Sequence, residues 1–343
     1  MPSIIPSSDK TYIIAELSAN HGGNLETALA SVDAICRTGA NAIKLQTFTP
    51  ESMTMNLDAD DFKANPSGPW AGRKMYDLYK ETMLPWEWHK PIFERAKKNG
   101  IDCFSSVFDV KAVDFLDQFD PPAFKIASFE ITDIPLIKYT AERKKPIIIS
   151  TGIATMEDIE LAISTCLQAQ NDKIVILKCT SAYPTPPEEA NLRGILTLKK
   201  MFDVEVGLSD HTMGHEAAII AVSLGARVIE KHFILNRSIQ SADSSFSLDE
   251  EEFKTMVEKV RLTEEMLGSH EFSLDRKTIS RRSKSRSIYI VNDIKKGDSF
   301  SFENLKSIRS NKGLHPRFLS EVIGKKSNED LKKGNPFQIQ SVA

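Results

Sequence analysis

Cysteine is scarce in this sequence, and the four residues Cys36, Cys103, Cys166 and Cys179 are widely spaced with no CxxC pair among them. Because each lies in an apolar stretch, we interpret them as reduced, structural thiols. No apolar run reaches the length of about 18 to 20 residues that a membrane span needs, and the N-terminus has no hydrophobic segment typical of a signal peptide. We therefore expect a cytoplasmic protein without a membrane partner.

An excess of charge of either sign is also missing. Lys and Arg number 44 against 47 Asp and Glu, a formal charge of −3, which gives no electrostatic reason to expect binding to nucleic acid or to an anionic membrane. Hydrophobic residues at 41 % and charged residues at 27 % are typical of a folded globular protein. The length of 343 residues fits two domains, or one large α/β barrel with a small addition.

Short apolar runs rich in β-branched residues alternate with stretches of helical period from Thr11 to about Gly268. This alternation is typical of repeated βα units around a parallel sheet. No GxGxxG motif follows the first run, and eight units fit this length, so we predict a closed (β/α)8 barrel rather than an open doubly wound sheet. The expected strands are Tyr12–Leu17, Ala42–Gln46, Asp102–Ser106, Ala123–Ile126, Pro146–Ser150, Ile174–Cys179, Glu205–Leu208 and Val228–Phe233.

One connection is longer than a βα loop normally is. The segment Met53–Pro85 contains several acidic residues together with Pro66, Gly68, Pro69 and Trp70. Long loops of this kind in barrel enzymes are usually functional. We predict an insertion over the barrel mouth that acts as a lid.

The chain changes character after the barrel. Residues 1–268 form the expected catalytic barrel domain, 269–286 a basic linker, and 287–343 a small tail domain. In the tail, DIKKGD at Asp293–Asp298 recurs as DLKKGN at Asp330–Asn335, which favours a compact, pseudo-symmetric, β-rich unit. Such a small core is marginal, so we expect this unit to gain stability by docking on its own barrel or on that of a second subunit.

Polar residues end nearly every expected strand, at the face where barrel enzymes place their chemistry. Side chains two apart on a strand point the same way, so Lys44 and Gln46 can enter the mouth together, as can Glu230 and His232. Two lysines and several hydroxyls on one rim favour a ligand with phosphate and carboxylate groups over internal ion pairs alone. The remaining rim residues are Glu16, Ser105, Ser106, Lys125, Ser128, Glu130, Ser150, Thr151, Thr180, Ser181, Tyr183, Ser209 and His211.

His211 and His232 end consecutive strands, which are neighbours in a barrel. Their imidazoles are therefore placed to share one divalent ion, with oxygen ligands or waters completing its shell. A hydrogen-bonded core role for each histidine explains the sequence equally well. Both interpretations stay open at this point.

Seven motifs occur in order along the chain: ELSANHGG, AIKLQT, FKIASFE, ISTG, CTSAYPT, GLSDH and IEKHF. Together they resemble the sialic acid synthase family, whose members condense phosphoenolpyruvate with an amino-sugar aldehyde. The tail resembles the C-terminal antifreeze-like (SAF) domain of that family. The resemblance covers essentially the whole chain and implies a TIM barrel followed by a SAF domain, assembled as a domain-swapped homodimer.

The family's functional residues can be carried over by position. The resemblance implies a divalent ion, Mn²⁺, Mg²⁺ or Co²⁺, on His211 and His232. The reaction of that family needs a base to take a proton from the attacking water, and either Glu16 or Glu130 fits this role; we place Lys125 with them among the catalytic residues. The implied phosphoenolpyruvate site comprises Lys44, Ser106, Lys125, Ser128, Ser150, Ser181 and Ser209, and the implied sugar site comprises Glu16, Gln46, Tyr183 and Asp243 together with Arg309 of the partner subunit.

Two departures separate this chain from the members that make N-acetylneuraminate. Ser181 stands where those members usually carry asparagine, and Gln240–Phe246 reads QSADSSF in place of a PGPDH-like segment. Both features resemble the branch that makes pseudaminic acid, which shares ELSANH and a DSxFS segment. The implied sugar is 2,4-diacetamido-2,4,6-trideoxy-L-altrose.

Three alternatives remain beside this interpretation. A synthase of N-acetylneuraminate or legionaminate would use the same mechanism. A barrel enzyme that joins phosphoenolpyruvate to a phosphorylated sugar would need a further phosphate site, and no additional arginine-rich rim motif is present. A non-enzymatic scaffold with a carbohydrate- or ice-binding tail is disfavoured by the complete set of polar strand ends, because buried polar groups cost stability unless they are satisfied.

Overall fold

The computed structural model describes residues 10–64, 71–268 and 273–343. The chain divides into two compact units, Met1–Gly268 and Ser269–Ala343. Pro66, Gly68, Pro69 and Trp70 of the expected insertion lie outside the described residues, as do the first four residues of the expected linker.

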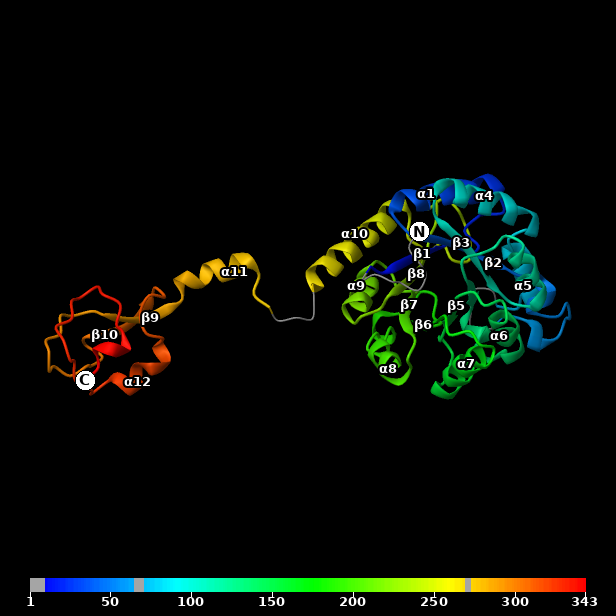
Figure 1. Cartoon of the computed structure of the whole chain (residues 1–343). Helices are drawn as coiled ribbons and strands as arrows, with labels where there is room; N and C mark the ends of the chain where they lie inside the picture. The colour runs from blue at the N-terminus through cyan, green and yellow to red at the C-terminus, as the bar shows by residue number, and fades with distance from the viewer. Residues whose placement is uncertain (1–9, 65–70, 269–272) are drawn as a thin grey trace. The chain divides into compact units, whose positions relative to one another are not determined.

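The first unit contains a closed barrel of eight parallel strands in sequential order (Figure 1). β1 pairs with both β2 and β8, so the sheet has no free edge. The barrel prediction is confirmed, and no strand end differs from its expected position by more than two residues. The strands are β1 (Tyr12–Glu16), β2 (Ala42–Thr47), β3 (Asp102–Val107), β4 (Phe124–Ile126), β5 (Ile147–Ser150), β6 (Ile174–Cys179), β7 (Glu205–Asp210) and β8 (Val228–His232).

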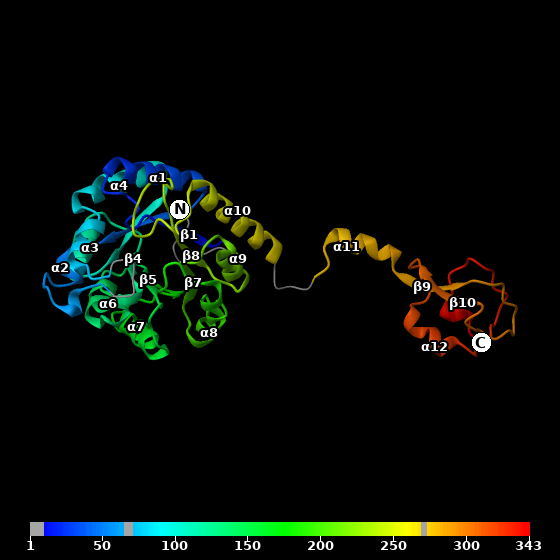
Figure 2. The ribbon, with the colours of Figure 1, turned by 180° about the vertical axis from the view of Figure 1, so that it is seen from behind.

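Helices surround the strands in both views of the barrel (Figures 1 and 2). Their apolar faces pack on the outward side chains of the strands in one continuous core, which includes Ile35, Ile43, Ile137 and Ile149. The helices are α1 (Leu25–Thr38), α2 (Pro50–Met53), α3 (Met75–Thr82), α4 (His89–Asn99), α5 (Val110–Asp117), α6 (Ile134–Ala141), α7 (Met156–Gln168), α8 (Gly194–Met201), α9 (Glu216–Ser223) and α10 (Glu250–Leu267), with short 3₁₀ turns η1 (Asp60–Phe62), η2 (Trp86–Trp88), η3 (Ser128–Thr132) and η4 (Pro187–Glu189).

A second, smaller core fills the inside of the barrel. It contains Tyr12, Ile14, Phe104, Ile148 and Val175, all buried. β1, β3 and β5 continue with Glu16, Ser106 and Ser150 in the same two-residue phase, so these polar side chains lie one layer further toward the carboxyl ends. The barrel interior therefore has an apolar floor beneath a polar mouth.

The described part of the insertion is more regular than a loop. It contains η1 and α3, and an antiparallel bridge between Lys63 and Lys74 joins its two halves. The side chain of Thr49 caps α2 by accepting a hydrogen bond from Ser52 N, which fixes where the chain leaves β2. The lid role of the insertion stays a prediction.

The second unit has its own core, built from Ile288, Ile290, Phe300, Leu305 and Phe337. Its regular β structure is one antiparallel pair, and isolated bridges supply the other pairings. The predicted linker contains a short helix, because Asp275 caps a turn by accepting a hydrogen bond from Thr278 N. The elements are α11 (Arg276–Arg281), η5 (Arg282–Lys284), β9 (Arg286–Ile290), β10 (Leu305–Arg309), η6 (Pro316–Phe318), α12 (Leu319–Val322) and η7 (Ile339–Ser341).

The two repeated turns of the tail hold each other. Asp293 accepts hydrogen bonds from Lys332 Nζ at 2.9 Å and from the next backbone N–H at 2.8 Å. Asp330 accepts the equivalent pair from Lys295 Nζ at 3.0 Å and from the N–H that follows at 2.8 Å. The predicted pseudo-symmetry is therefore present at the level of individual hydrogen bonds.

Across the described ranges, no helix combines the length and the apolar character that a bilayer-spanning segment requires.

Candidate active site

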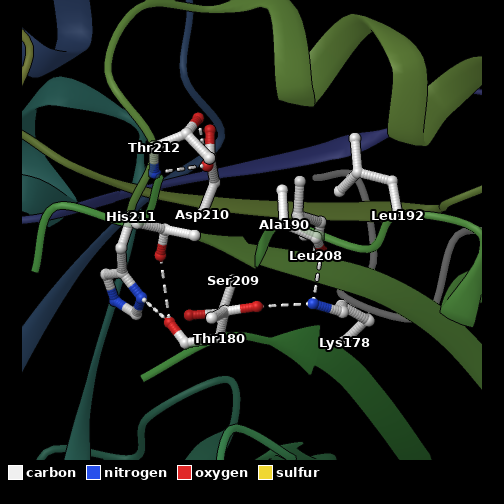
Figure 3. A pocket seen from close by; sticks show the side chains of 10 residues that line it. Lys178, Thr180, Ala190, Leu192, Leu208, Ser209, Asp210, His211 and Thr212 are labelled. Carbon is white, nitrogen blue, oxygen red and sulfur yellow. Dashed lines mark hydrogen bonds between the residues drawn. The ribbon is translucent and has the colours of Figure 1, made fainter. Parts of the chain in front are cut away.

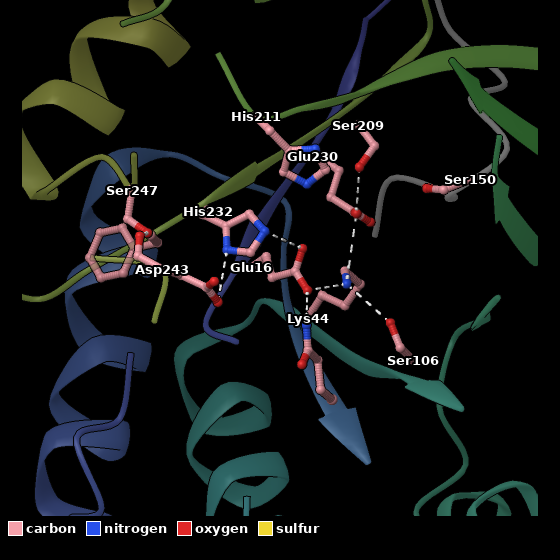
Figure 4. A network of polar contacts seen from close by, with 12 residues as sticks. Glu16, Lys44, Ser106, Ser150, Ser209, His211, Glu230, His232, Asp243 and Ser247 are labelled. Atoms are coloured by element: carbon pink, nitrogen blue, oxygen red, sulfur yellow. Dashed lines mark hydrogen bonds and ion pairs between the residues drawn. The ribbon is translucent and has the colours of Figure 1, made fainter. Parts of the chain in front are cut away.

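Glu16 contacts several side chains of the polar layer at the barrel mouth (Figure 4). Its Oε1 accepts hydrogen bonds from Lys44 Nζ at 2.5 Å and from Gln46 Nε2 at 2.9 Å, and its Oε2 lies 3.2 Å from His232 Nε2. Burial alone would raise the pKa of Glu16, but the charges of Lys44 and His232 hold it well below its ordinary value. Glu16 is therefore an anchored carboxylate at neutral pH.

Lys44 makes further polar contacts besides the one with Glu16. Its ammonium donates to Ser106 Oγ at 3.1 Å and lies 3.7 Å from Glu230 Oε1, which also accepts from Ser209 Oγ at 3.0 Å. Burial disfavours the charged lysine, but the two carboxylates more than offset this and raise the pKa of Lys44. The side chains of β1, β2, β3, β7 and β8 thus form one connected charged network.

Lys125 on β4 forms a second cationic position. Its Nζ donates to Ser150 Oγ at 2.6 Å and to the Ile126 carbonyl at 2.9 Å, both neutral oxygens. Burial lowers the pKa of this ammonium, and Glu230 at longer range partly opposes the effect. A fully buried cation bonded to neutral groups is suited to receive an anionic ligand.

A narrow cradle of serines lies beside Lys125. The Gly152 N–H donates to Ser128 Oγ at 3.0 Å. A Cβ at position 152 would lie 2.1 Å from Ser181 Oγ and 2.8 Å from Ser128 Oγ, so only glycine permits this approach. Among the described residues Ser181 Oγ is buried and has no hydrogen-bond partner, which leaves a hydroxyl free for a ligand.

Glu130 lies just beyond β4, in η3. Burial raises its pKa to about 7, although the charge of Lys125 opposes part of that rise. Its Oε2 is buried and makes no hydrogen bond within the described part of the chain. A carboxyl group that titrates near neutral pH is suited to exchange a proton during a reaction.

His211 and His232 face each other with ring centroids 5.3 Å apart. His211 Nδ1 lies 3.1 Å from the Thr180 carbonyl, which can only accept, so that nitrogen carries the proton and Nε2 keeps its lone pair. His232 Nδ1 lies 3.5 Å from Asp243 Oδ2 and makes no hydrogen bond with any described residue.

The described residues contain no cluster of three or more His, Cys, Asp or Glu side chains at metal-ligand spacing. The protein therefore offers two imidazoles to a divalent cation, and water or substrate oxygens would supply the other ligands. This donor set fits a metal that keeps open coordination positions.

Aromatic side chains line the histidine side of the mouth. Tyr183, which is 49 % exposed, lies 4.3 Å from the His211 ring between centroids, and Phe246 lies 5.0 Å from His232. They come from the loops after β6 and β8, and Asp243 lies on the same loop as Phe246. The structure thus brings the predicted sugar-site residues of the barrel next to the histidine pair.

The barrel unit gathers the predicted site residues of residues 1–268 at one end of the strands. Arg309 ends β10 in the other unit, where its side chain is exposed, so its predicted contact with a sugar stays a prediction. Sequence reasoning missed two contributors. Gly152 gave no signal beyond the ISTG motif, and Cys179, interpreted as purely structural, places its thiol 3.8 Å from His211 Nδ1; the two-residue phase of β6 places this side chain inside the barrel.

A small pocket that His211 helps to line lies at the ends of β6 and β7 (Figure 3). Its buried lysine, Lys178, donates to Thr180 Oγ1 at 2.6 Å and to the Ala190 carbonyl at 2.5 Å. The backbone oxygen of the same threonine accepts a hydrogen bond from His211 Nδ1. These contacts tie the loop after β6 to the imidazole of His211.

Comparison with known proteins relates both units to described families. The NeuB family matches residues 31–272, and the SAF domain matches residues 285–343. A pseudaminic acid synthase from Campylobacter jejuni is 52 % identical over 96 % of each chain, and one from Helicobacter pylori is 44 % identical over 96 % of this chain and 97 % of that protein. A solved N-acetylneuraminic acid synthetase from Leptospira borgpetersenii, in complex with citrate, is 30 % identical with a TM-score of 0.72, covering 80 % of this chain and 91 % of that one.

Proposed function

This chain belongs to the NeuB family, and from that premise we propose that it condenses phosphoenolpyruvate with 2,4-diacetamido-2,4,6-trideoxy-L-altrose and water to give pseudaminic acid and phosphate. The family predicted from the seven motifs is confirmed, as is the SAF domain. The chain is a phosphoenolpyruvate-dependent condensing enzyme of the transferase type.

The choice of sugar rests on two observations. The relatives named for pseudaminic acid synthesis are more similar to this chain than the neuraminic acid synthetase is. The segment that departs from the neuraminate makers also lies at the histidine pair, where it supplies Asp243 and the Phe246 ring. A synthase of N-acetylneuraminate or legionaminate with the same mechanism is the second candidate.

The main support for the proposed reaction is a pair of buried ammonium groups that lie among serine hydroxyls. Lys44 and Lys125 bind the carboxylate and phosphate groups of phosphoenolpyruvate, with Ser128, Ser150 and Ser181 as additional donors. Glu16 and Glu230 already balance the two lysine charges in the free protein. Phosphoenolpyruvate is a trianion, so its binding needs a further cation to balance its charge.

His211 and His232 supply the position for that cation, which we infer to be Mn²⁺, Mg²⁺ or Co²⁺. When bound, it supplies a Lewis acid that polarises the aldehyde oxygen of the open-chain sugar. The support in this chain is the tautomer of His211, whose Nε2 lone pair is free, and the proximity of the Glu16 carboxylate to His232.

The chemistry joins C3 of phosphoenolpyruvate to C1 of the sugar, whose aldehyde oxygen takes up a proton. Water adds to the cationic C2, and the adduct then breaks its bond to the phosphate oxygen to leave a 2-keto acid and inorganic phosphate. The base that takes the proton of the water is Glu130 rather than Glu16. Glu130 titrates at about pH 7, whereas the partners of Glu16 hold its pKa low.

We further propose a cytoplasmic, domain-swapped homodimer in which Arg309 of the partner subunit contacts the sugar. Charge supports docking of the tail on a barrel. Residues 269–343 contain 16 Lys and Arg against 8 Asp and Glu, whereas residues 1–268 contain 28 against 39. These opposite net charges favour the proposed docking of a tail on a barrel at neutral pH.

Phosphate release from phosphoenolpyruvate tests the proposed reaction. We expect release by the purified protein only when an amino-sugar is added, and a loss of several orders of magnitude in Lys125→Met, which keeps the length of the side chain without its charge. Release that is independent of any sugar, or full activity in Lys125→Met, would contradict the assignment.

A further inference from the structure

Asp210 and Lys231 form an ion pair on the outer side of the barrel wall. They are register partners across β7 and β8, and each directly precedes the histidine of its strand. Since alternate side chains of a strand face opposite sides, the histidines point into the mouth and this pair points away from it. The Lys231 Nζ lies 2.7 Å from Asp210 Oδ2, and the two side chains are 0 % and 1 % exposed.

Stability alone does not account for this pair. A buried ion pair is often no more stabilising than an apolar pair of similar volume, because both charges lose their hydration. The outward side chains that precede the pair on β7 and β8 are apolar, as Val206, Leu208 and Ile229 illustrate. At the end of the neighbouring β6 the buried Lys178 also points outward. Charged side chains therefore interrupt a largely apolar layer at the ends of β6, β7 and β8.

The polar atoms of the pair are satisfied by a single further residue. Asp210 Oδ1 accepts hydrogen bonds from Thr212 N at 2.9 Å and from Thr212 Oγ1 at 2.8 Å (Figure 3). Lys231 Nζ donates to the Thr212 carbonyl. This closed network joins the residues on both sides of His211 to β8.

His211 depends on that network for its position relative to β8. The ladder between the two strands ends at Asp210 and Lys231, one residue before His211. The other hydrogen bonds of His211 lead to the loop after β6, through Thr185 N at 2.9 Å and the Thr180 carbonyl at 3.1 Å. His232 lies on β8 itself, directly after Lys231. Among the described residues, the network is thus the last hydrogen-bonded link between the two strands before the imidazoles.

We propose that Asp210, Lys231 and Thr212 are positioning residues that set the separation of the His211 and His232 imidazoles and so their joint affinity for a divalent cation. The proposal rests on the metal role given to the two histidines under the proposed function. Because the side chains of Asp210 and Lys231 point away from the mouth, we expect these residues to act through the backbone of β7 and not by direct contact with substrate or metal.

Binding of Mn²⁺, followed by the electron paramagnetic resonance signal of the free ion, tests the proposal without substrate. The variant Asp210→Leu/Lys231→Met replaces the ion pair by an apolar pair, and we expect its affinity for Mn²⁺ to fall by about 10- to 100-fold. A second pair isolates one hydrogen bond: Thr212→Val should weaken binding several-fold, while Thr212→Ser, which keeps the hydroxyl, should bind as the wild type does.

A matched control separates positioning from general stability. Ile137→Ala on α6 removes a buried side chain that packs on other strands of the barrel, and it should lower the melting temperature without changing Mn²⁺ affinity. Wild-type affinity in both the apolar exchange and Thr212→Val would overturn the proposal, as would an equal loss in Ile137→Ala. If the double variant does not fold, the comparison of Mn²⁺ affinity between Thr212→Val and Thr212→Ser decides. Absence of saturable Mn²⁺ binding by the wild type would instead overturn the metal assignment itself, and this proposal with it.

Discussion

Glu16 and Glu130 are both carboxyl groups near the barrel mouth, but their surroundings shift their pKa values in opposite directions. Glu16 contacts Lys44 and His232, which keep it ionised, whereas burial without a charged partner within hydrogen-bond distance raises the pKa of Glu130 to about 7. A group near its pKa at working pH can both take and return a proton, so we propose different tasks for these two residues.

The pKa of Glu130 leads to a prediction about pH. As a base, Glu130 must be deprotonated, so we expect kcat to rise as pH increases through about 7 and Glu130→Gln to lower kcat by about 10²- to 10⁴-fold. The raised pKa also means that the folded state binds more protons than the unfolded state between about pH 4.5 and 7. The free energy of unfolding therefore falls as pH rises through that range.

Chemical denaturation of the wild type and of Glu130→Gln at several pH values measures how the free energy of unfolding depends on pH. The decrease with rising pH should be smaller in Glu130→Gln. A flat pH–rate profile in the wild type, or a glutamine variant with normal kcat, would return the role of base to Glu16.

The histidine pair gives a prediction on metal removal. Excess EDTA should abolish turnover and added Mn²⁺, Mg²⁺ or Co²⁺ should restore it, since the two imidazoles provide too few ligands to retain the ion against a chelator. His211→Ala and His232→Ala should each lose activity by orders of magnitude while the circular dichroism spectrum stays that of the wild type. Near-normal rates in either variant would favour the structural interpretation of these histidines.

The polar residues of the site follow from a simple pattern in the sequence, because two-residue periodicity places Lys44, Lys125, Glu230 and His232 on the inner face of their strands. The pattern does not show how they are protonated. That depends on which carboxylate lies nearest to which cation, a property of neighbouring strands rather than of any one segment. The need for glycine at position 152 also becomes visible only when the Ser181 and Ser128 hydroxyls are in place.

At the scale of elements, the strands were predictable because each apolar run fills both the barrel interior and the layer beneath the helices. The ladder of β7 continues through Ser209 and Asp210, beyond the apolar run, because backbone pairing with β8 persists where the side chains turn polar. The tail was less predictable. Ile294, Phe300 and Phe337 of its core come from loops and an isolated bridge, which have no period to detect.

Helix α7 follows the serine cradle and begins with a capping box, in which Thr155 and Asp158 satisfy each other's backbone N–H groups. Removing the cap should affect the helix but not the site. We expect Thr155→Ala to lower the unfolding free energy by about 1 kcal/mol and to leave kcat/KM for phosphoenolpyruvate unchanged. Chemical denaturation and steady-state kinetics measure the two effects, and a large kinetic defect would mean that α7 controls the cradle above it.

At the scale of the whole molecule, the account requires that Arg309 serve a barrel other than its own. Co-refolding of inactive Arg309→Ala with inactive His211→Ala tests this arrangement. In a swapped dimer each mixed pair has one site with both lesions and one with neither, so up to about a quarter of wild-type activity should return when subunits mix at random.

If Arg309 serves its own barrel, every site keeps one lesion, and mixed dimers identified by differential tags will stay inactive. The charge difference between the units adds a second expectation: high salt should weaken tail docking and raise the KM for the sugar more than that for phosphoenolpyruvate. Complementation without this salt effect would keep the swapped arrangement and remove charge as its cause.

The most direct test of the central claim is the ratio of kcat/KM for two sugars, measured by phosphate release at saturating phosphoenolpyruvate. The account predicts that 2,4-diacetamido-2,4,6-trideoxy-L-altrose is used at least 100-fold better than N-acetylmannosamine, because polar groups arranged for one sugar are left unpaired by the other. Equal or better efficiency with N-acetylmannosamine would contradict the claim and make this chain a neuraminate synthase.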